Sequence, residues 1–274
     1  MTVLNFIDAM NRLQSYTAQQ CKRIPALLHA YERHRNPEYM HQLRVAIKKL
    51  RAVVRYMRTY DGKPLKKFAH HLRDFFRQAG ALREIEIQME WLQQNGGTAL
   101  VAVLQYQKTI DAHIAGLQPL IPHFIDAVKD YSPALLRLCH QQHPAALQAY
   151  AAALKNELLQ QAQHAQPNGW HELRKLIKQL LYAWHWLDAD GQAALLTQQQ
   201  YTYFDQLQEY IGNWHDALLR TAWLGDTQLY LHTSAAVRQA FAVCWQHNRQ
   251  QVQAAEKKVR QQLRRIPHLF KSLR

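Results

Sequence analysis

Apolar residues recur along most of this 274-residue chain at alternating steps of three and four, which is the spacing of one face of an α-helix. The clearest such row comprises Met40, Leu43, Ile47, Leu50, Val54 and Met57. Strand-like alternation of apolar and polar residues is rare, and Gly and Pro occur only nine times each. The pattern therefore predicts an all-α protein.

Turn signals such as Ser132-Pro133 interrupt the helical pattern. Between these signals the sequence predicts eight helices, at about residues 3–34, 37–60, 63–94, 98–130, 134–165, 169–189, 193–224 and 234–266. We expect Pro119 and Pro122 to kink the fourth helix, and Pro144 to kink or split the fifth.

Two segments of the chain repeat one another. The sequence His41-Gln-Leu-Arg44-Val-Ala-Ile-Lys48 matches His171-Glu-Leu-Arg174-Lys-Leu-Ile-Lys178, which lies 130 residues later. A second match relates residues 78–84 to residues 210–216. The simplest interpretation is two related four-helix bundles, at residues 1–132 and 133–274. The short connections favour antiparallel neighbouring helices.

Basic residues follow the first apolar row one position later. This basic stripe comprises His41, Arg44, Lys48, Arg51, Arg55 and Arg58. The next predicted helix carries a second stripe, which comprises Lys63, Lys66, His70, Arg73 and Arg77. Aligned like charges destabilise a helix, so two adjacent stripes predict an extended polyanionic ligand that supplies the missing charge. The alternative is a solvated face whose Lys and Arg stems cover apolar surface.

The composition agrees with a polyanionic ligand. The formal net charge is +14 and the isoelectric point is near 9.8. Residues 41–83 contain twelve of the 34 Lys and Arg residues but only two acids, Asp61 and Asp74. Such a balance favours nucleic acid, anionic lipid or another polyanion as the partner.

Other classes of protein fit the sequence less well. Three widely spaced cysteines, Cys21, Cys139 and Cys244, predict buried thiols in a reducing compartment rather than a disulfide framework. The sequence shows no signal-peptide pattern and no apolar run of about 18 residues. We therefore expect a cytoplasmic protein without membrane insertion.

The residues also give little sign of a metal site or of catalysis. The closest histidine pairs, His70-His71 and His140-x-x-His143, lack carboxylate or cysteine partners at the spacing of a zinc site. The chain has no Gly-rich phosphate loop and no nucleophile elbow. The sequence thus predicts no metal, no cofactor and no enzymatic activity.

These motifs resemble those of the CHAD domain, the conserved histidine α-helical domain. The resemblance spans nearly the whole chain and rests on H-x-L-R-x-x-x-K-K-L-R at 41–51, on residues 80–84, and on H-x-L-R-K-x-x-K at 171–178. It implies two pseudo-repeated four-helix bundles around a basic central groove or pore, in a stand-alone member of the family. It also implies non-enzymatic binding of inorganic polyphosphate, and with it an association with cytoplasmic polyphosphate granules.

The resemblance and the stripes together give a predicted set of polyphosphate-binding residues. The set consists of His41, Arg44, Lys48, Lys49, Arg51, Arg55, Lys66, His70, Arg73, Arg77, Arg83, His171, Arg174, Lys175 and Lys178. An interhelical ion pair is the alternative role of Arg83 with Glu84. Leu181 stands where the first repeat has Arg51, and residues 203–209 are not basic. We therefore expect an asymmetric site that is stronger in the N-terminal half.

Polyphosphate offers charge and no base edges, so a row of cations about 5 Å apart can follow it without reading a sequence. Its affinity should fall as the salt concentration rises. Protonation of His41, His70, His171 and His185 should strengthen binding below about pH 6.5. A nucleic-acid-binding protein is the main alternative, and it would present the stripes on a convex surface or among exposed aromatic residues.

Overall fold

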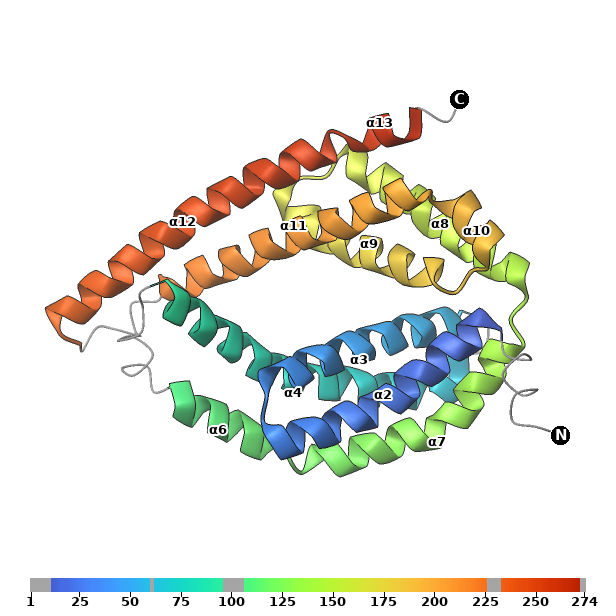
Figure 1. The fold of residues 1–274 in the computed structure, drawn as a ribbon, viewed down its shortest axis with the longest axis horizontal. Coiled ribbons are helices and arrows are strands. Elements are labelled where there is room, and N and C mark those ends of the chain that lie inside the picture. The colour runs from blue at the N-terminus through green and yellow to red at the C-terminus, as the bar shows by residue number, and fades with distance from the viewer. Residues whose placement is uncertain (1–10, 60–61, 96–105, 226–232, 272–274) are drawn as a thin grey trace. The chain divides into compact units, whose positions relative to one another are not determined.

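A computed structural model describes residues 11–59, 62–95, 106–225 and 233–271 of the chain (Figure 1). Every regular element in these ranges is helical, which confirms the all-α class. The elements are α2 (Arg12–His34), α3 (Pro37–Met57), α4 (Gly62–Gln94), α6 (Tyr106–Leu117), α7 (Leu120–His140), α8 (Pro144–Gln163), the 3₁₀ turn η1 (Pro167–Gly169), α9 (Trp170–Trp184), α10 (Ala189–Leu195), α11 (Gln198–Leu224), α12 (Ala235–Leu263) and α13 (Ile266–Lys271).

The turn predicted at Ser132-Pro133 is wrong, because α7 continues through Pro133 to His140. The Ser132 hydroxyl donates a hydrogen bond to the carbonyl of Val128 in the preceding turn. The buried face of α7 packs against α2 on both sides of the proline. This packing outweighs the hydrogen bond that proline cannot donate.

The turn lies instead at residues 141–143, and Pro144 is the first residue of α8. Proline is well suited to a helix start, because the N–H that it lacks would have no partner there. The prediction that Pro144 splits a helix is therefore confirmed. The predicted helix 98–130 is divided at Gln118 and Pro119, between α6 and α7.

Two later predicted helices are also divided into shorter ones in the structure. The break predicted between the helices 169–189 and 193–224 lies inside the short helix α10. The next helix, α11, begins after Thr197, whose hydroxyl accepts a hydrogen bond from the backbone N–H of Gln200. The last predicted helix, 234–266, ends at Leu263 and is followed by α13.

The chain forms two compact units, each discontinuous in sequence. Unit 1 comprises residues 1–87, 106–147 and 185–188, and unit 2 comprises residues 88–105, 148–184 and 189–274. The sequence-based division at residue 132 and the basic central groove or pore remain predictions.

The core of unit 1 is built on α3. The six residues of its predicted apolar row are all 0 or 1% exposed. They pack in a core that also contains Ile24 and Leu28 of α2 and Leu65 and Leu72 of α4. The start of α3 is fixed by Asn36, whose side chain accepts a hydrogen bond from the backbone N–H of Glu38. With the apolar row buried, the basic stripe must lie about 100° around the helix.

The core of unit 2 is built on helix α9. Trp170 and Ile177 are fully buried, as is Phe204 of the neighbouring helix α11. The indole ring of Trp170 packs edge-on against that of Trp214, with ring centroids 4.8 Å apart. Helix α11 packs in turn against α12.

The three cysteines are free and buried, as the sequence predicted. None of the described helices has both the length and the apolar character needed to cross a membrane.

Candidate functional site

The basic stripes of α3 and α4 line one groove in unit 1, with a volume of about 780 Å³. Its lining consists of Arg51, Val54, Arg55, Arg58, Lys66, Lys67, Ala69, His70 and Arg73. We call it the cationic groove, because six of these nine residues are Lys or Arg and none is acidic. Five members of the predicted set are here, namely Arg51, Arg55, Lys66, His70 and Arg73. The structure adds Arg58, which belongs to the predicted stripe, and Lys67.

Burial and neighbouring cations both disfavour the charge of Arg51 in this groove. Arg51 is half-buried, and burial together with the neighbouring charges of Arg55 and Arg73 lowers its pKa. The groove thus holds more positive charge than its own residues neutralise, which is the condition for binding an anion.

Asp74 of α4 partly offsets this charge. Its carboxylate lies 2.7 Å from Nε2 of His70, 3.5 Å from Nε of Arg73 and 3.9 Å from Nη2 of Arg77. Nη2 of Arg73 lies 2.5 Å from Nδ1 of His70. In the tautomer that carries its proton on Nε2, His70 donates to Asp74 and accepts from Arg73. One carboxylate therefore orients three basic side chains of α4.

Phe76 of α4 is surrounded by three cations of α3. Its ring centroid lies 4.2 Å from Cζ of Arg44, 4.9 Å from Cζ of Arg51 and 5.7 Å from Nζ of Lys48. The negative face of the ring attracts each cation and so offsets part of their mutual repulsion. Phe76 falls on an apolar row of α4 with Leu65, Leu72 and Ala79, so its sequence pattern is that of a core residue and does not indicate this role. Burial, with the charges of Arg83 and Arg51, lowers the pKa of Arg44 to about 10.

In both units, the arginine of the H-x-L-R motif lies against a glycine of the next long helix. A Cβ atom at Gly80 would lie 2.8 Å from Nη1 of Arg44, and one at Gly212 would lie 2.6 Å from Nη2 of Arg174. Each guanidinium donates to the backbone carbonyl four residues before its glycine, at 2.9 and 3.0 Å respectively. The glycines thus make room for an arginine side chain.

The charge of the second unit differs at the equivalent positions. Asp205 and Glu209 of α11 stand where α4 has Arg73 and Arg77, 132 residues earlier. Leu181 replaces a groove arginine and is 4% exposed. The face of unit 2 that corresponds to the cationic groove therefore has mixed charge.

Lys178 shows the effect of this change. Burial, and then the charge of Arg174, lower its pKa to about 8. Asp205, Glu209 and Asp216 act in the opposite direction, because their carboxylates favour the charged amine. The three carboxylates thus offset only part of the effect of burial and of Arg174 on Lys178.

His171 is also held differently from His41, its exposed counterpart in unit 1. Its ring lies against the ring of His215, with centroids 4.4 Å apart. Burial, with the neighbouring charges of His215 and Lys175, lowers the pKa of His171. Its protonation is therefore shifted below the pH of about 6.5 that the sequence suggested.

A family model of the CHAD domain matches residues 13–225. The chain belongs to the CHAD domain family. Among solved structures, the protein titled PptA from Streptomyces chartreusis is similar, with a TM-score of 0.70 and 16% sequence identity. The match covers 92% of this chain and 98% of that chain, and shows that the two share a fold. No curated protein matches.

Other members of the predicted set lie outside the lining of the groove in this CHAD protein. Lys49 packs over the Tyr16 ring of α2, 6.0 Å from its centroid. Arg83 pairs with Glu86 of its own helix at 3.4 Å, and both side chains are largely buried. This ion pair lies within α4. In unit 2, the exposed Lys175 pairs with Glu172 at 2.5 Å.

Among the described residues of this CHAD chain, no group of three or more His, Cys, Asp or Glu side chains could hold a metal ion.

Phe76→Leu should lower the free energy of unfolding of the CHAD protein by about 1–2 kcal/mol at low salt, because three cations lose the ring between them. The loss should shrink at high salt, where the repulsion is screened. Urea unfolding at two salt concentrations checks this, with Phe76→Tyr as a control that keeps the ring. A Leu variant as stable as the wild type at low salt would contradict it.

Lys178 makes stability depend on pH. The unfolded amine has a pKa of 10.5 and the native one a pKa of about 8, so the unfolded chain binds more protons between these values. The free energy of unfolding should therefore rise from about pH 8 to 10.5, by roughly 1–3 kcal/mol. Lys178→Met should lack this rise, whereas exposed Lys175→Met should keep it. Identical pH profiles for the two variants in urea unfolding would refute the assignment.

Proposed function

We propose that this protein binds inorganic polyphosphate without converting it, and that the cationic groove of unit 1 is its main binding surface. The observation that carries the proposal is the lining of the groove, in which six Lys and Arg side chains and no carboxylate meet. The membership of the CHAD family supports the proposal.

The chemistry of the groove suits a flexible chain of phosphates. Arginine presents a planar fork of N–H donors to phosphate oxygens, and lysine presents a compact charge. The exposed side chains Arg55, Lys66 and Arg73 can turn toward a ligand as it enters. Binding would release counterions from the polyanion, so affinity should fall steeply as salt rises, by analogy with DNA.

The contacts behind the groove favour tight binding. Arg44 donates a hydrogen bond to the backbone carbonyl of Phe76, and Arg51 packs on the ring of Phe76. These two contacts hold both guanidinium groups in place. Side chains that are already ordered lose less conformational freedom when a ligand binds. Phe76 therefore acts as a positioning residue.

The same contacts favour polyphosphate over nucleic acid. Proteins that bind single strands usually stack bases on exposed aromatic rings among their cations. None of the nine residues that line the groove is Phe, Tyr or Trp, and cations already surround the nearby ring of Phe76. The imidazole of His70, which is the one ring in the lining, already contacts Asp74 and Arg73. The groove thus offers mainly charge and little surface on which bases could stack.

The same lining supports the proposal that binding occurs without chemical conversion. Phosphoryl transfer commonly relies on metal ions held by acidic side chains. The nine lining residues include no acidic residue, and the carboxylate of the adjacent Asp74 is already paired with His70 and Arg73. The buried free thiols fit a reducing compartment, so we place the protein in the cytoplasm, at polyphosphate granules.

Reversing two exposed charges of the groove tests the site. Arg55→Glu with Lys66→Glu should lower the affinity for long-chain polyphosphate on the order of 100-fold at fixed salt, because two attractions become repulsions. These residues are better probes than Arg44, whose replacement would also break its bond to the Phe76 carbonyl. Isothermal titration calorimetry measures the affinity, and circular dichroism checks the fold.

The matched control reverses Lys22 and Arg33, two exposed residues of α2 in the same unit. It makes the same change in net charge away from the groove, and its affinity should stay within about threefold of wild type. Equal losses in both double variants would show that only total charge matters, which would remove the groove as the site.

A further inference from the structure

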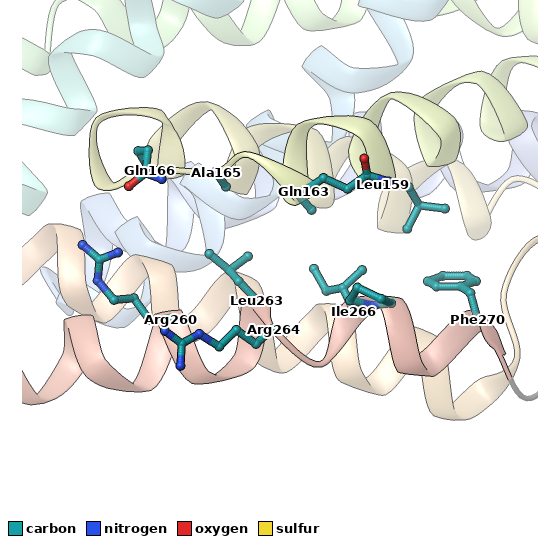
Figure 2. A pocket seen from close by; sticks show the side chains of 11 residues that line it. Leu159, Gln163, Ala165, Gln166, Arg260, Leu263, Arg264, Ile266 and Phe270 are labelled. Atoms are coloured by element: carbon teal, nitrogen blue, oxygen red, sulfur yellow. The ribbon is translucent and has the colours of Figure 1, made fainter.

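A second cavity lies in unit 2, separate from the cationic groove. It has a volume of about 440 Å³ and lies between the end of α8 and the corner between α12 and α13 (Figure 2). Helix α8 ends at Gln163, α12 ends at Leu263, and α13 begins at Ile266. The cavity forms where these helices end, and its α12 and α13 walls lie beyond the region that the family model matches.

The cavity changes in character from one end to the other. Leu159 and Phe270 lie at one end, Leu263 and Ile266 line the middle, and the guanidinium of Arg260 lies at the opposite end (Figure 2). Ile266 is only 4% exposed, so its side chain belongs to the floor. An apolar chamber with a cationic end is suited to a ligand that is itself amphipathic.

The apolar end is held in place by contacts of α13. The side-chain amide of Gln200 donates to the carbonyl of Leu269 at 2.9 Å. The ring of Phe270 lies 6.2 Å from the ring of Phe204, and Nζ of Lys155 lies 5.2 Å from its centroid. This wall is therefore formed before any ligand enters.

The cationic end keeps a net positive charge. Nε and Nη2 of Arg260 both donate to one oxygen of Glu256, at 3.0 and 2.8 Å. Arg264 also lines the cavity, and its guanidinium has no hydrogen-bond or ion-pair partner in the described part of the chain. Two cations of the cavity, Arg260 and Arg264, thus stand against one carboxylate.

We infer that this pocket binds a medium-chain fatty acid, with its carboxylate at Arg260 and Arg264 and its alkyl chain along Leu263, Ile266 and Phe270. The charge of the head group complements the cationic end, and the alkyl chain covers the apolar floor. The volume lies near the lower end of the range for small-molecule sites, about 300–1,000 Å³, which suits one alkyl chain rather than two. Polyphosphate has no apolar part to occupy this pocket.

Calorimetric titration of the full chain with monomeric dodecanoate tests the inference, which is independent of polyphosphate binding. The wild type should bind one dodecanoate, and affinity should drop about fourfold for each methylene removed. Arg264→Glu should weaken binding by about tenfold or more. The matched control Arg238→Glu, an exposed residue of the same helix, should bind like the wild type.

Two further comparisons complete the test. Ala162→Phe should block the pocket, because Ala162 lines it and is 9% exposed. Dodecyltrimethylammonium, with the same chain and the opposite charge, should not bind. The inference is overturned if wild type shows no saturable binding of dodecanoate, if Arg264→Glu binds it as tightly, or if the cationic amphiphile binds equally well. If Ala162→Phe does not fold, the inference is tested by Arg264→Glu and by the comparison of dodecanoate with dodecyltrimethylammonium.

Discussion

Repulsion among like charges on α3 and α4 is the constraint on which the organisation of unit 1 depends. The apolar row of α3 must be buried, and it is almost completely so. The basic residues that follow each apolar residue by one position must then share one neighbouring face of the helix. They do so although repulsion between like charges is unfavourable. Burial of the apolar row thus stabilises an arrangement of cations that their own charges oppose.

The two units relieve this repulsion in different ways. In unit 1 the ring of Phe76 lies among three cations, and Asp74 pairs with others at the groove. In unit 2, Asp205 and Glu209 replace basic residues, and their carboxylates favour the charged form of Lys178. The two units therefore differ in charge at equivalent positions, and an excess of cations remains in unit 1.

Much of this could be predicted from the sequence, because a helix fixes which residues share a face. The period of the apolar row located both the core of α3 and the stripe beside it. The same reasoning could not separate Lys49 from the groove residues, since only the position of α2 shows that Lys49 packs over Tyr16. Phe76 was missed because an aromatic residue in an apolar row has the pattern of a core residue.

Tertiary packing accounts for the other differences. The sequence of α7 has a proline that normally ends a helix, but its packing on α2 extends over both sides of Pro133. Gly80 and Gly212 each accommodate an arginine side chain from another helix, a contact that depends on how the helices pack. The pocket beside α13 arises where the end of α8 lies against the consecutive helices α12 and α13, which are far from α8 in sequence, and no local pattern indicates it.

The most direct test of the central claim is a competition titration of the wild-type protein at physiological salt. Long-chain polyphosphate would compete with single-stranded and duplex DNA at equal phosphate charge. If the cationic groove is a polyphosphate site, polyphosphate should bind more tightly than either nucleic acid. Equal or tighter binding of DNA would contradict the account, because the stripes would then be a general cationic surface.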